Sequence, residues 1–493
     1  MTALLQTLDH ADSIRREVAP RTTQKHKAEF GQFMTPSSVA RFMASLFPAS
    51  DKAKCRLLDA GAGVGALSCA FLDRWKAGGF DFKSVEADAY EIDEKLRDHL
   101  SRHLFAYEGV EPKIIAGDFI LLNTQGELFN KRSYTHAILN PPYKKISSAS
   151  LHRQALRTMG IETVNLYSAF VALAVELAAP GGQIIAIIPR SFCNGPYYRP
   201  FRDFIFARSA LKHMHLFESR NKAFKDDDVL QENIIIRLER GGEQGTVTVS
   251  TSTDDSFSDL ATHAHPFNRI VFPDDPERFI HVPTSTAKST IELSAGVTHS
   301  LADIGVKVST GPVVDFRLRE HLRDMPEPGT VPLLYPGHFN MNGTEWPKPE
   351  AKKPNAIQHN RDTAKWLYPN GFYCVVRRFS AKEERRRIVA SVVSPSAFGE
   401  TELLGFENHL NLFHENKKGL PQLLANGLAA FLNTTAVDEN FRRFNGHTQV
   451  NATDLKLIKY PSRKVLMELG EWAINNLSLT QAMIDDQFER IST

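Results

Sequence analysis

The chain has 493 residues, of which 42% are hydrophobic and 24% charged, a balance typical of globular proteins that excludes wholesale disorder. This length exceeds one ordinary hydrophobic core and predicts two or three domains. The 59 basic and 57 acidic residues leave a net charge of +2, which neither indicates nor excludes a nucleic-acid partner, because such proteins can gather positive charge on one face.

The cysteines and the apolar stretches indicate the cellular compartment in which the protein is expected. Its four cysteines are too scattered for a zinc site, a redox pair or a disulfide framework; they are Cys55, Cys69, Cys193 and Cys374. The first twenty residues break their few apolar side chains with charges, so no signal-peptide core is expected. The most apolar stretch, 166–189, contains Glu176 and a Pro-Gly-Gly break, which is typical of a buried helix and strand. We therefore expect a cytoplasmic protein with no membrane partner and no metal site.

Short apolar runs alternate with amphipathic stretches from Lys54 to about Arg240, which predicts a helix-flanked parallel sheet. In chain order, strands are expected at 56–59, within 82–92, and at 113–116, 136–139 and 183–189, with helices at 66–75, 94–104 and 165–179. The runs 213–218 and 232–238 are expected to pair as an antiparallel edge.

The composition changes after this region. Between 241 and 299, Gly, Ser, Thr and Asp become frequent, so this stretch is either a linker or a β-rich insertion. From Leu301 onward, strand-like runs are expected at 372–377 and 387–393, and helices at 420–432 and 462–489. The predicted domains are an N-terminal helical segment (1–28), an α/β domain (29–245), a linker or insertion (246–300) and a mixed α+β domain (301–493).

A glycine-rich turn, DAGAGVG at 59–65, follows the first predicted strand. Glycines there allow a tight turn and close approach to a ligand, and a helix N-terminus favours anionic groups. Gly61, Gly63 and Ala66 also satisfy the looser dinucleotide pattern, so a nicotinamide enzyme and a purely structural turn stay open as alternatives. Asp59 favours a ligand with an ammonium group, because its carboxylate would repel a pyrophosphate.

Acidic residues also follow the next two predicted strands. Glu91 can accept hydrogen bonds from both ribose hydroxyls of a nucleoside cofactor. Asp118 can accept an adenine amino group, and Phe119 offers an apolar wall beside it. The alternatives near Glu91 are Glu86, Asp88 and Asp93.

The run Asn140-Pro141-Pro142-Tyr143 after the fourth predicted strand determines the predicted chemistry. An exocyclic amino nitrogen of a base is a poor nucleophile, because its lone pair is delocalised into the ring. The Asn140 side-chain oxygen and the Pro141 carbonyl can accept its two hydrogens, and the prolines fix this backbone in advance. Tyr143 offers a ring on which a base pulled from the duplex can stack. The chain has no Pro-Cys pair, which argues against ring-carbon methylation of cytosine.

The order of these motifs resembles the gamma class of N6-adenine DNA methyltransferases, the Type II modification enzymes with an Eco57I-like methylase domain found in restriction–modification systems. The matching segments are QFMTP (32–36), DAGAGVG (59–65), Glu91, Asp118 and NPPY (140–143). The motif resemblance covers about 29–240 and is looser beyond. It implies a Rossmann-like, mostly parallel seven-stranded methyltransferase sheet and a C-terminal target-recognition domain, with S-adenosyl-L-methionine as cofactor and double-stranded DNA as partner.

The resemblance also implies roles for single residues. Those implied for the cofactor are Phe33, Thr35 and Pro36 over the methionine portion, Asp59, Ala60, Gly61 and Gly63 at the turn, Glu91 at the ribose, and Asp118 and Phe119 at the adenine. Those implied for the target base are Asn140, Pro141, Pro142 and Tyr143, with Phe224 as a second aromatic. Two alternatives stay open: Thr35 as a helix cap before Pro36, and Phe217 or an ordinary core role in place of Phe224.

The C-terminal region is expected to read the DNA sequence. Arg377 and Arg378 end an apolar strand and can contact guanine edges or clamp phosphates. Asn408 and Gln449 are candidate base readers, although isolated amides are more often surface hydrogen-bonders. The run 382–387 belongs either to this interface or to a solvated segment of mixed charge.

The chain shows no convincing Asp…Glu-x-Lys nuclease cluster, so we predict modification without cleavage, with any cognate endonuclease acting as a separate protein. The first alternative to adenine methylation is N4-cytosine methylation, in which Ser or Asp more often occupies the position of Asn140. Three others are N6-adenine methylation of RNA, a nicotinamide oxidoreductase and a non-catalytic DNA-binding subunit.

Overall fold

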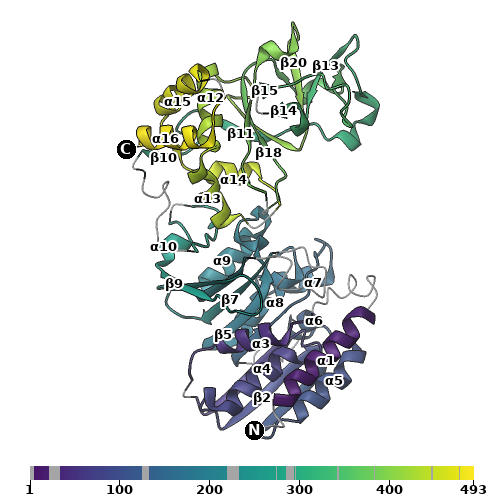
Figure 1. Ribbon diagram of the computed structural model, residues 1–493. Helices are drawn as coiled ribbons and strands as arrows, with labels where there is room; N and C mark the ends of the chain where they lie inside the picture. The colour runs from purple at the N-terminus through teal and green to yellow at the C-terminus, as the bar shows by residue number, and fades with distance from the viewer. Residues whose placement is uncertain are drawn as a thin grey trace. The chain divides into compact units, whose positions relative to one another are not determined.

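A computed structural model describes residues 5–21, 34–50, 52–124, 133–218, 232–273, 275–284, 294, 296–340, 343–381, 384–445, 448–476 and 478–492. The chain divides into two compact units, Met1–Thr286 and Ala287–Thr493 (Figure 1). Unit 1 therefore extends about forty residues beyond the end that we expected for the α/β domain. No helix in the described residues is both long and apolar enough to cross a membrane.

Within the described residues of unit 1, nine strands form one sheet. They are β1 (Lys54–Ala60), β2 (Ser84–Glu91), β3 (Val110–Ala116), β4 (Tyr134–Leu139), β5 (Ala178–Pro189), β6 (Ser209–Phe217), β7 (Asn233–Arg240), β8 (Val247–Ser252) and β9 (Ala261–His265). Their order is β3-β2-β1-β4-β5-β7-β6-β8-β9, and only the β5–β7, β6–β7 and β8–β9 pairs are antiparallel. This confirms the predicted Rossmann-like, mostly parallel sheet.

Helices cover both faces of this sheet. They are α1 (Leu5–Arg21), α3 (Ser37–Ser45), α4 (Ala66–Arg74), α5 (Glu94–Phe105), α6 (Phe119–Thr124), α7 (Leu151–Arg157), α8 (Leu166–Leu177), α9 (Arg199–Arg208) and the short α10 (Phe267–Ile270). Along β5, Ile184 and Ile188 belong to the core under α8 and α9, whereas Ile185 and Ile187 belong to the core under α3 and α4. This two-residue alternation, with both sides apolar, is what a strand buried on two faces requires.

Three expectations for unit 1 need correction, and one alternative that was left open is decided. The number of strands is nine rather than seven, because β8 pairs in parallel with β6 and β9 pairs with β8. The predicted pairing of 213–218 with 232–238 is confirmed, but β8 prevents it from being an edge. The stretch 247–265, left open as a linker or a β-rich insertion, is therefore part of the sheet. Finally, α8 ends at Leu177, since Ala178 is extended and pairs with Tyr134.

Unit 2 is mixed α+β, as expected. Its strands are β10 (Val297–His299), β11 (Lys307–Thr310), β12 (Leu322–Arg323), β13 (Thr330–Leu334), β14 (Phe339–Asn340), β15 (Gly343–Thr344), β16 (Ala356–Gln358), β17 (Leu367–Pro369), β18 (Tyr373–Arg377), β19 (Ala390–Val393), β20 (Leu403–Phe406), β21 (Leu410–His414) and β22 (Tyr460–Pro461). Its helices are α12 (Gln422–Leu432), α13 (Thr435–Phe444), α14 (Ala452–Leu457), α15 (Arg463–Asn475) and α16 (Gln481–Ser492). The main sheets have the orders β11-β21-β18-β19 and β12-β16-β13-β20-β17.

Two predicted elements of unit 2 are shorter or broken. The single helix expected at 462–489 is two helices, α15 and α16, because Asn476 is extended and Ser478 has a φ of 64°. The strand expected from Arg387 begins at Ala390, since the backbone N–H groups of Arg387 and Ile388 donate to Asp438 on α13. Both deviations come from contacts with sequence-distant parts or from local turns that periodicity does not show.

Helices α12 and α15 pack backbone against backbone in unit 2. A Cβ atom placed on Gly427 would lie 1.7 Å from the carbonyl oxygen of Leu466, and one on Gly470 would lie 1.8 Å from that of Leu423. No side chain fits at either crossing position, so the two glycines set the distance between the helices.

We expect Gly427→Ala to destabilise unit 2 by about 3 kcal/mol or more, because the new methyl group must push a buried helix away. Gly337→Ala is the matched control, since a Cβ there meets no atom within 4 Å. Thermal unfolding should show a fall of about 5 °C or more for Gly427→Ala and none for the control. Equal melting temperatures would contradict this account of the crossing.

Candidate active site

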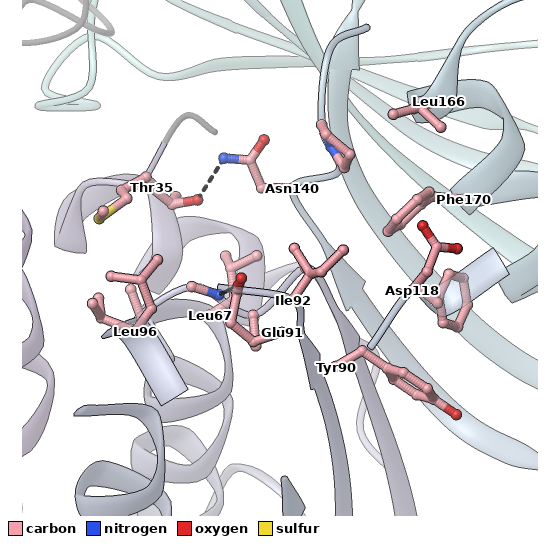
Figure 2. A pocket seen from close by; sticks show the side chains of 18 of the residues that line it. Thr35, Leu67, Tyr90, Glu91, Ile92, Leu96, Asp118, Asn140, Leu166 and Phe170 are labelled. Atoms are coloured by element: carbon pink, nitrogen blue, oxygen red, sulfur yellow. Dashed lines mark hydrogen bonds between the residues drawn. The ribbon is translucent and has the colours of Figure 1, made fainter. Parts of the chain in front are cut away.

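A cavity opens at the carboxyl edge of the sheet, where the strand order reverses between β1 and β4 (Figure 2). Its lining includes the turn after β1, from Gly61 to Val64, and Asn140 and Pro142 after β4. Parallel strands bring their carboxyl ends to one edge, so motifs eighty residues apart in the sequence meet there. The glycine turn and the NPPY loop therefore share one cavity.

The turn after β1 depends on glycine. Gly61, Gly63 and Gly65 have φ values of 77°, 58° and 90°, in the region that side chains rarely adopt. The backbone N–H groups of Gly61 and Ala62 both donate to the carbonyl of Tyr90, at 3.0 and 2.9 Å, which fixes the turn against β2. A Cβ on Gly63 would meet no atom within 4 Å, so the backbone of the turn is open to a ligand at that point.

Asp59 lies under this turn and is 1% exposed. Ser68 donates to Oδ2 at 2.6 Å, whereas Oδ1 has no hydrogen-bond partner among the described residues. Burial raises the pKa of Asp59 to about 7, against the lowering effect of Ser68, and the nearby charge of Glu91 adds to the rise. A buried carboxyl with one unbonded oxygen suits a cationic ligand group.

Glu91 closes the cavity wall at the end of β2. Its Oε2 accepts from the backbone N–H of Gly63 at 2.7 Å, and its Oε1 accepts from that of Asp93 at 2.8 Å. Burial raises the pKa of Glu91, while these two hydrogen bonds oppose the rise. Each carboxylate oxygen keeps acceptor capacity for a further donor.

The alternatives to Glu91 have other contacts. Asp93 accepts from the backbone N–H of Lys95 and caps α5. Asp88 accepts from the hydroxyl of Tyr134 at 2.7 Å, and Glu86 pairs with Arg56. Among these acids, Glu91 is the one that lines the cavity.

Asp118 is held by an unexpected partner. Its Oδ1 accepts from the backbone N–H of Leu121 at 2.9 Å, and its Oδ2 contacts His152 Nε2 at 2.8 Å. Burial opposes ionisation of Asp118, but the hydrogen bonds from His152 and Leu121 hold its pKa below the ordinary value. The bond to Asp118 raises the pKa of His152. His152, on α7, lines the cavity, and no sequence motif pointed to it.

Apolar side chains form the remaining wall near Asp118. Phe119 packs against Tyr90 and Phe170, with ring centroids 4.9 and 5.0 Å apart. Ile92, labelled in Figure 2, lines the same cavity. Its exposed fraction is 48%. Of these residues only Phe119 was predicted from the sequence. Phe170 was missed because the apolar face of α8 that carries it looks like ordinary core.

Asn140 is fixed by two side chains. Its Nδ2 donates to Thr35 Oγ1 at 2.9 Å, a bond drawn in Figure 2, and Tyr143 donates its hydroxyl to Asn140 Oδ1 at 3.2 Å. Burial raises the pKa of Tyr143, so its phenol stays a donor. The helix-cap alternative for Thr35 is wrong, because α3 begins after Pro36 without a side-chain cap.

Other predicted residues lie around the cavity or outside the described chain. Thr35, Gly61, Gly63, Glu91, Asp118, Phe119, Asn140 and Pro142 line it, whereas Pro36, Asp59, Ala60, Pro141 and Tyr143 are not part of its lining. Phe33 and Phe224 lie outside the described residues. Phe217, the alternative to Phe224, is a core residue that packs against His215 and Phe257.

Unit 2 brings three of the four predicted DNA-contacting residues together. Arg378 donates to the carbonyl of Asn408 at 3.1 Å and to Oε1 of Gln449 at 3.4 Å. The fourth, Arg377, forms an ion pair with Glu384.

In part of the charged run 382–387 the arginines bond to other residues of unit 2. That part is therefore neither a DNA interface nor a solvated segment of mixed charge. Arg387 is buried and bonds to Ser380 and Asn445, and Arg386 bonds to Gln481 and to the carbonyl of Thr434. Lys382 lies outside the described residues.

The Asp118–His152 pair predicts a pH-dependent contribution to stability. The lowered pKa of Asp118 makes this contribution present above about pH 3.8, and the raised pKa of His152 makes it disappear as the pH rises beyond 6.5. The melting-temperature difference between wild type and His152→Gln should thus be largest between these limits and small at pH 9. His263→Gln, on β9 and outside the cavity lining, is the control. A difference that grows toward pH 9 would refute the assignment.

Comparison with known proteins identifies the family. A family model described as "Eco57I restriction-modification methylase" matches residues 56–224. Type II methyltransferase M.BsuBI of Bacillus subtilis is 51% identical over 502 residues, covering 100% of this chain and 98% of that protein. Type II methyltransferase M.PstI of Providencia stuartii is 43% identical and covers 93% of this chain and 92% of that protein.

A solved complex of DrdV with DNA is 12% identical, with a TM-score of 0.49, and covers 91% of this chain and 57% of that one. A likeness at this score carries no inference, so the fold rests on the strand order. The extent and identity of the two sequence matches settle the family: the chain belongs to the Type II methyltransferases of restriction–modification systems.

Proposed function

We propose that this chain transfers the methyl group of S-adenosyl-L-methionine to the N6 amino group of an adenine flipped out of double-stranded DNA. It does so within a short specific sequence and protects host DNA in a restriction–modification system. The observation that carries the proposal is the single cavity that joins Asn140 to the glycine turn, Glu91 and Asp118. A donor site and an acceptor site are thereby adjacent, as direct transfer between them requires.

The residues present fit S-adenosyl-L-methionine. The unbonded Oδ1 of Asp59 can accept from an ammonium group near the open backbone at Gly63. Glu91 would bind the ribose hydroxyls, and Asp118 the adenine amino group, with Phe119 and its aromatic neighbours as the apolar wall. When bound, S-adenosyl-L-methionine supplies an electrophilic methyl group on a sulfonium centre.

Asn140 activates the acceptor in this proposal. In this role its Oδ1, which accepts from Tyr143 in the structure, accepts one hydrogen of the target amine. The Pro141 carbonyl accepts the second hydrogen. These two bonds favour a more tetrahedral nitrogen, whose lone pair is then available for methyl transfer, and Thr35 holds the amide in this orientation beforehand.

Adenine is favoured over cytosine by the asparagine at position 140, where N4-cytosine enzymes more often have Ser or Asp. The family membership removes the nicotinamide oxidoreductase from the alternatives. Magnesium-dependent cutting is not expected of this chain, so any cognate endonuclease is a separate protein.

The decisive experiment incubates the full chain with DNA and isotope-labelled S-adenosyl-L-methionine, and locates the label at single-nucleotide resolution. Label on adenine N6 at one recurring sequence supports the proposal. Label on cytosine N4, label on RNA alone, or no label on any nucleic acid would each refute it. Added magnesium should produce no strand breaks.

We expect Asn140→Ala to lower the rate of methyl transfer by about a hundredfold or more, because a hydrogen-bond acceptor for the target amine is lost. Binding of S-adenosyl-L-methionine should survive, since Asp59 and Glu91 are unchanged. Single-turnover kinetics and isothermal titration measure the two quantities separately. Loss of both together would contradict the role assigned to Asn140. Asn426→Ala, on α12 of unit 2, is the control.

Cofactor binding should depend on pH through Asp59. With a pKa of about 7, Asp59 is protonated in the free protein at lower pH, whereas an ammonium ligand needs the carboxylate. The affinity for S-adenosyl-L-methionine should fall by up to about tenfold per unit below pH 7 and level off above it. Asp59→Asn should bind S-adenosyl-L-methionine weakly, and its affinity should not change with pH in this way.

His152→Gln separates the titration of Asp59 from that of the His152–Asp118 pair. The affinity of this variant for S-adenosyl-L-methionine should still fall as the pH drops below 7. Isothermal titration from pH 5.5 to 8.5 tests the expectation. A flat profile for the wild type would rule it out.

A further inference from the structure

The end of β18 and two other segments of unit 2 are joined by backbone hydrogen bonds. Arg378 N–H donates to the carbonyl of His409 at 2.8 Å, and Val450 N–H donates to the carbonyl of Arg378 at 2.7 Å. Phe379 forms an isolated bridge with Gln449. Side chains carried by these segments are therefore held in fixed relation to one another.

We call Arg378, Phe379 and His409 the aromatic–basic face. The rings of Phe379 and His409 lie 4.9 Å apart, and the guanidinium of Arg378 lies 5.8 Å from the centre of the Phe379 ring. Phe379 is 40% exposed, as is the His409 side chain. An exposed aromatic between two basic groups has no role in the core of unit 2, and it is typical of surfaces that contact nucleic-acid bases.

A buried carboxylate orients His409. Glu407 is fully buried, and its two oxygens lie 2.6 and 2.7 Å from His409 Nδ1. The backbone N–H of His409 also donates to Glu407 Oε2 at 2.8 Å. Because Nδ1 is engaged with Glu407, Nε2 is the ring nitrogen left for an external partner.

The charges around this face favour a polyanion. The neighbouring Asp315 is neutralised by Lys353 at 2.7 Å, which leaves Glu407 with His409 as its partner. Although burial opposes it, the contacts with Lys353 and the charge of His409 hold the pKa of Asp315 below its ordinary value. With one hydrogen between Nδ1 and Glu407 and another on Nε2, the His409–Glu407 pair can donate from Nε2 to an external acceptor. Exposed Phe316 and Arg317 follow Asp315 in the chain.

We propose that His409 reads one guanine of the recognised DNA sequence by donating a hydrogen bond from Nε2 to its N7 or O6 atom. This inference rests on the proposed function. Guanine is the base whose major-groove edge carries two adjacent acceptors, whereas the adenine edge sets an amino donor beside its acceptor, and that donor would oppose a second donor at Nε2. Phe379 packs on the imidazole and limits its rotation, and Glu407 fixes which nitrogen faces the DNA.

The test begins from the sequence found by nucleotide-resolved methylation. Each guanine in it is replaced in turn by 7-deazaguanine, which lacks the N7 acceptor, or by 2-aminopurine, which lacks O6. At one guanine, wild type should lose about tenfold or more in kcat/KM with one of these analogues. His409→Ala should be slower on natural DNA by a similar factor and should lose nothing further with that analogue.

Glu407→Gln keeps the size of the partner and removes its charge, so it should reduce the preference for the same guanine without removing the imidazole. His359→Ala, an exposed histidine elsewhere in unit 2, should behave as wild type with every analogue. If His409→Ala does not fold, Glu407→Gln and His409→Asn give the same comparison.

Three outcomes overturn the inference. His409→Ala could keep the wild-type sensitivity to every analogue, or wild type could tolerate all of them. The third is a fall in kcat/KM of His409→Ala that is the same on every DNA sequence, which would indicate that His409 contacts a phosphate instead. A wild type that methylates DNA while these comparisons fail refutes only the reading role of His409. A wild type that places no label on DNA refutes the proposed function.

Discussion

The parallel register of β1 with β2 on one side and β4 on the other is the constraint on which the site depends. Because these strands run the same way, the turn after β1, Glu91 and Asn140 arrive at one edge. The reversal of strand order between β1 and β4 leaves a gap there that no crossover helix fills. Both faces of the strands are apolar and packed, so slipping the register by one residue would move each side chain into the opposite core and disrupt the packing there.

Much of unit 1 could be predicted from the sequence, because its signals are local. Most of the buried strands contain a short apolar run, and the motifs at 59–65, 91, 118 and 140–143 come at or directly after the end of a strand, so the parallel arrangement places these motifs together without further information. The side chains that complete the site could not be predicted. His152 on α7 and Phe170 on α8 reach the cavity only through packing, and nothing in their own segments distinguishes them from surface or core residues.

Unit 2 was less predictable, because its order comes from sequence-distant polar contacts. Arg387 looked like part of a solvated charged run, yet it is buried with Ser380 and Asn445. Asp438 on α13 accepts from two backbone N–H groups at the start of the β19 segment, across fifty residues of chain. Residue type and periodicity describe one segment at a time and cannot show such pairings. The sequence resemblance favoured Asn408 over its neighbour His409, because the contact of His409 with the buried Glu407 is visible only in the folded unit.

The strands that the sequence left unassigned explain how the Asn140 amide is held. Phe257, in the loop between β8 and β9, stacks on Phe42 of α3 with ring centroids 4.1 Å apart, and Asp255 accepts from Ser38 at 2.8 Å. These contacts fix the first turns of α3, and Thr35 lies immediately before that helix. Since Thr35 accepts the Asn140 amide hydrogen, the far edge of the sheet is connected to the orientation of Asn140 through α3. An amide that could rotate would present its NH₂ group to the cavity as readily as its oxygen, so β8 and β9 contribute to the orientation of Asn140 although neither strand lines the cavity.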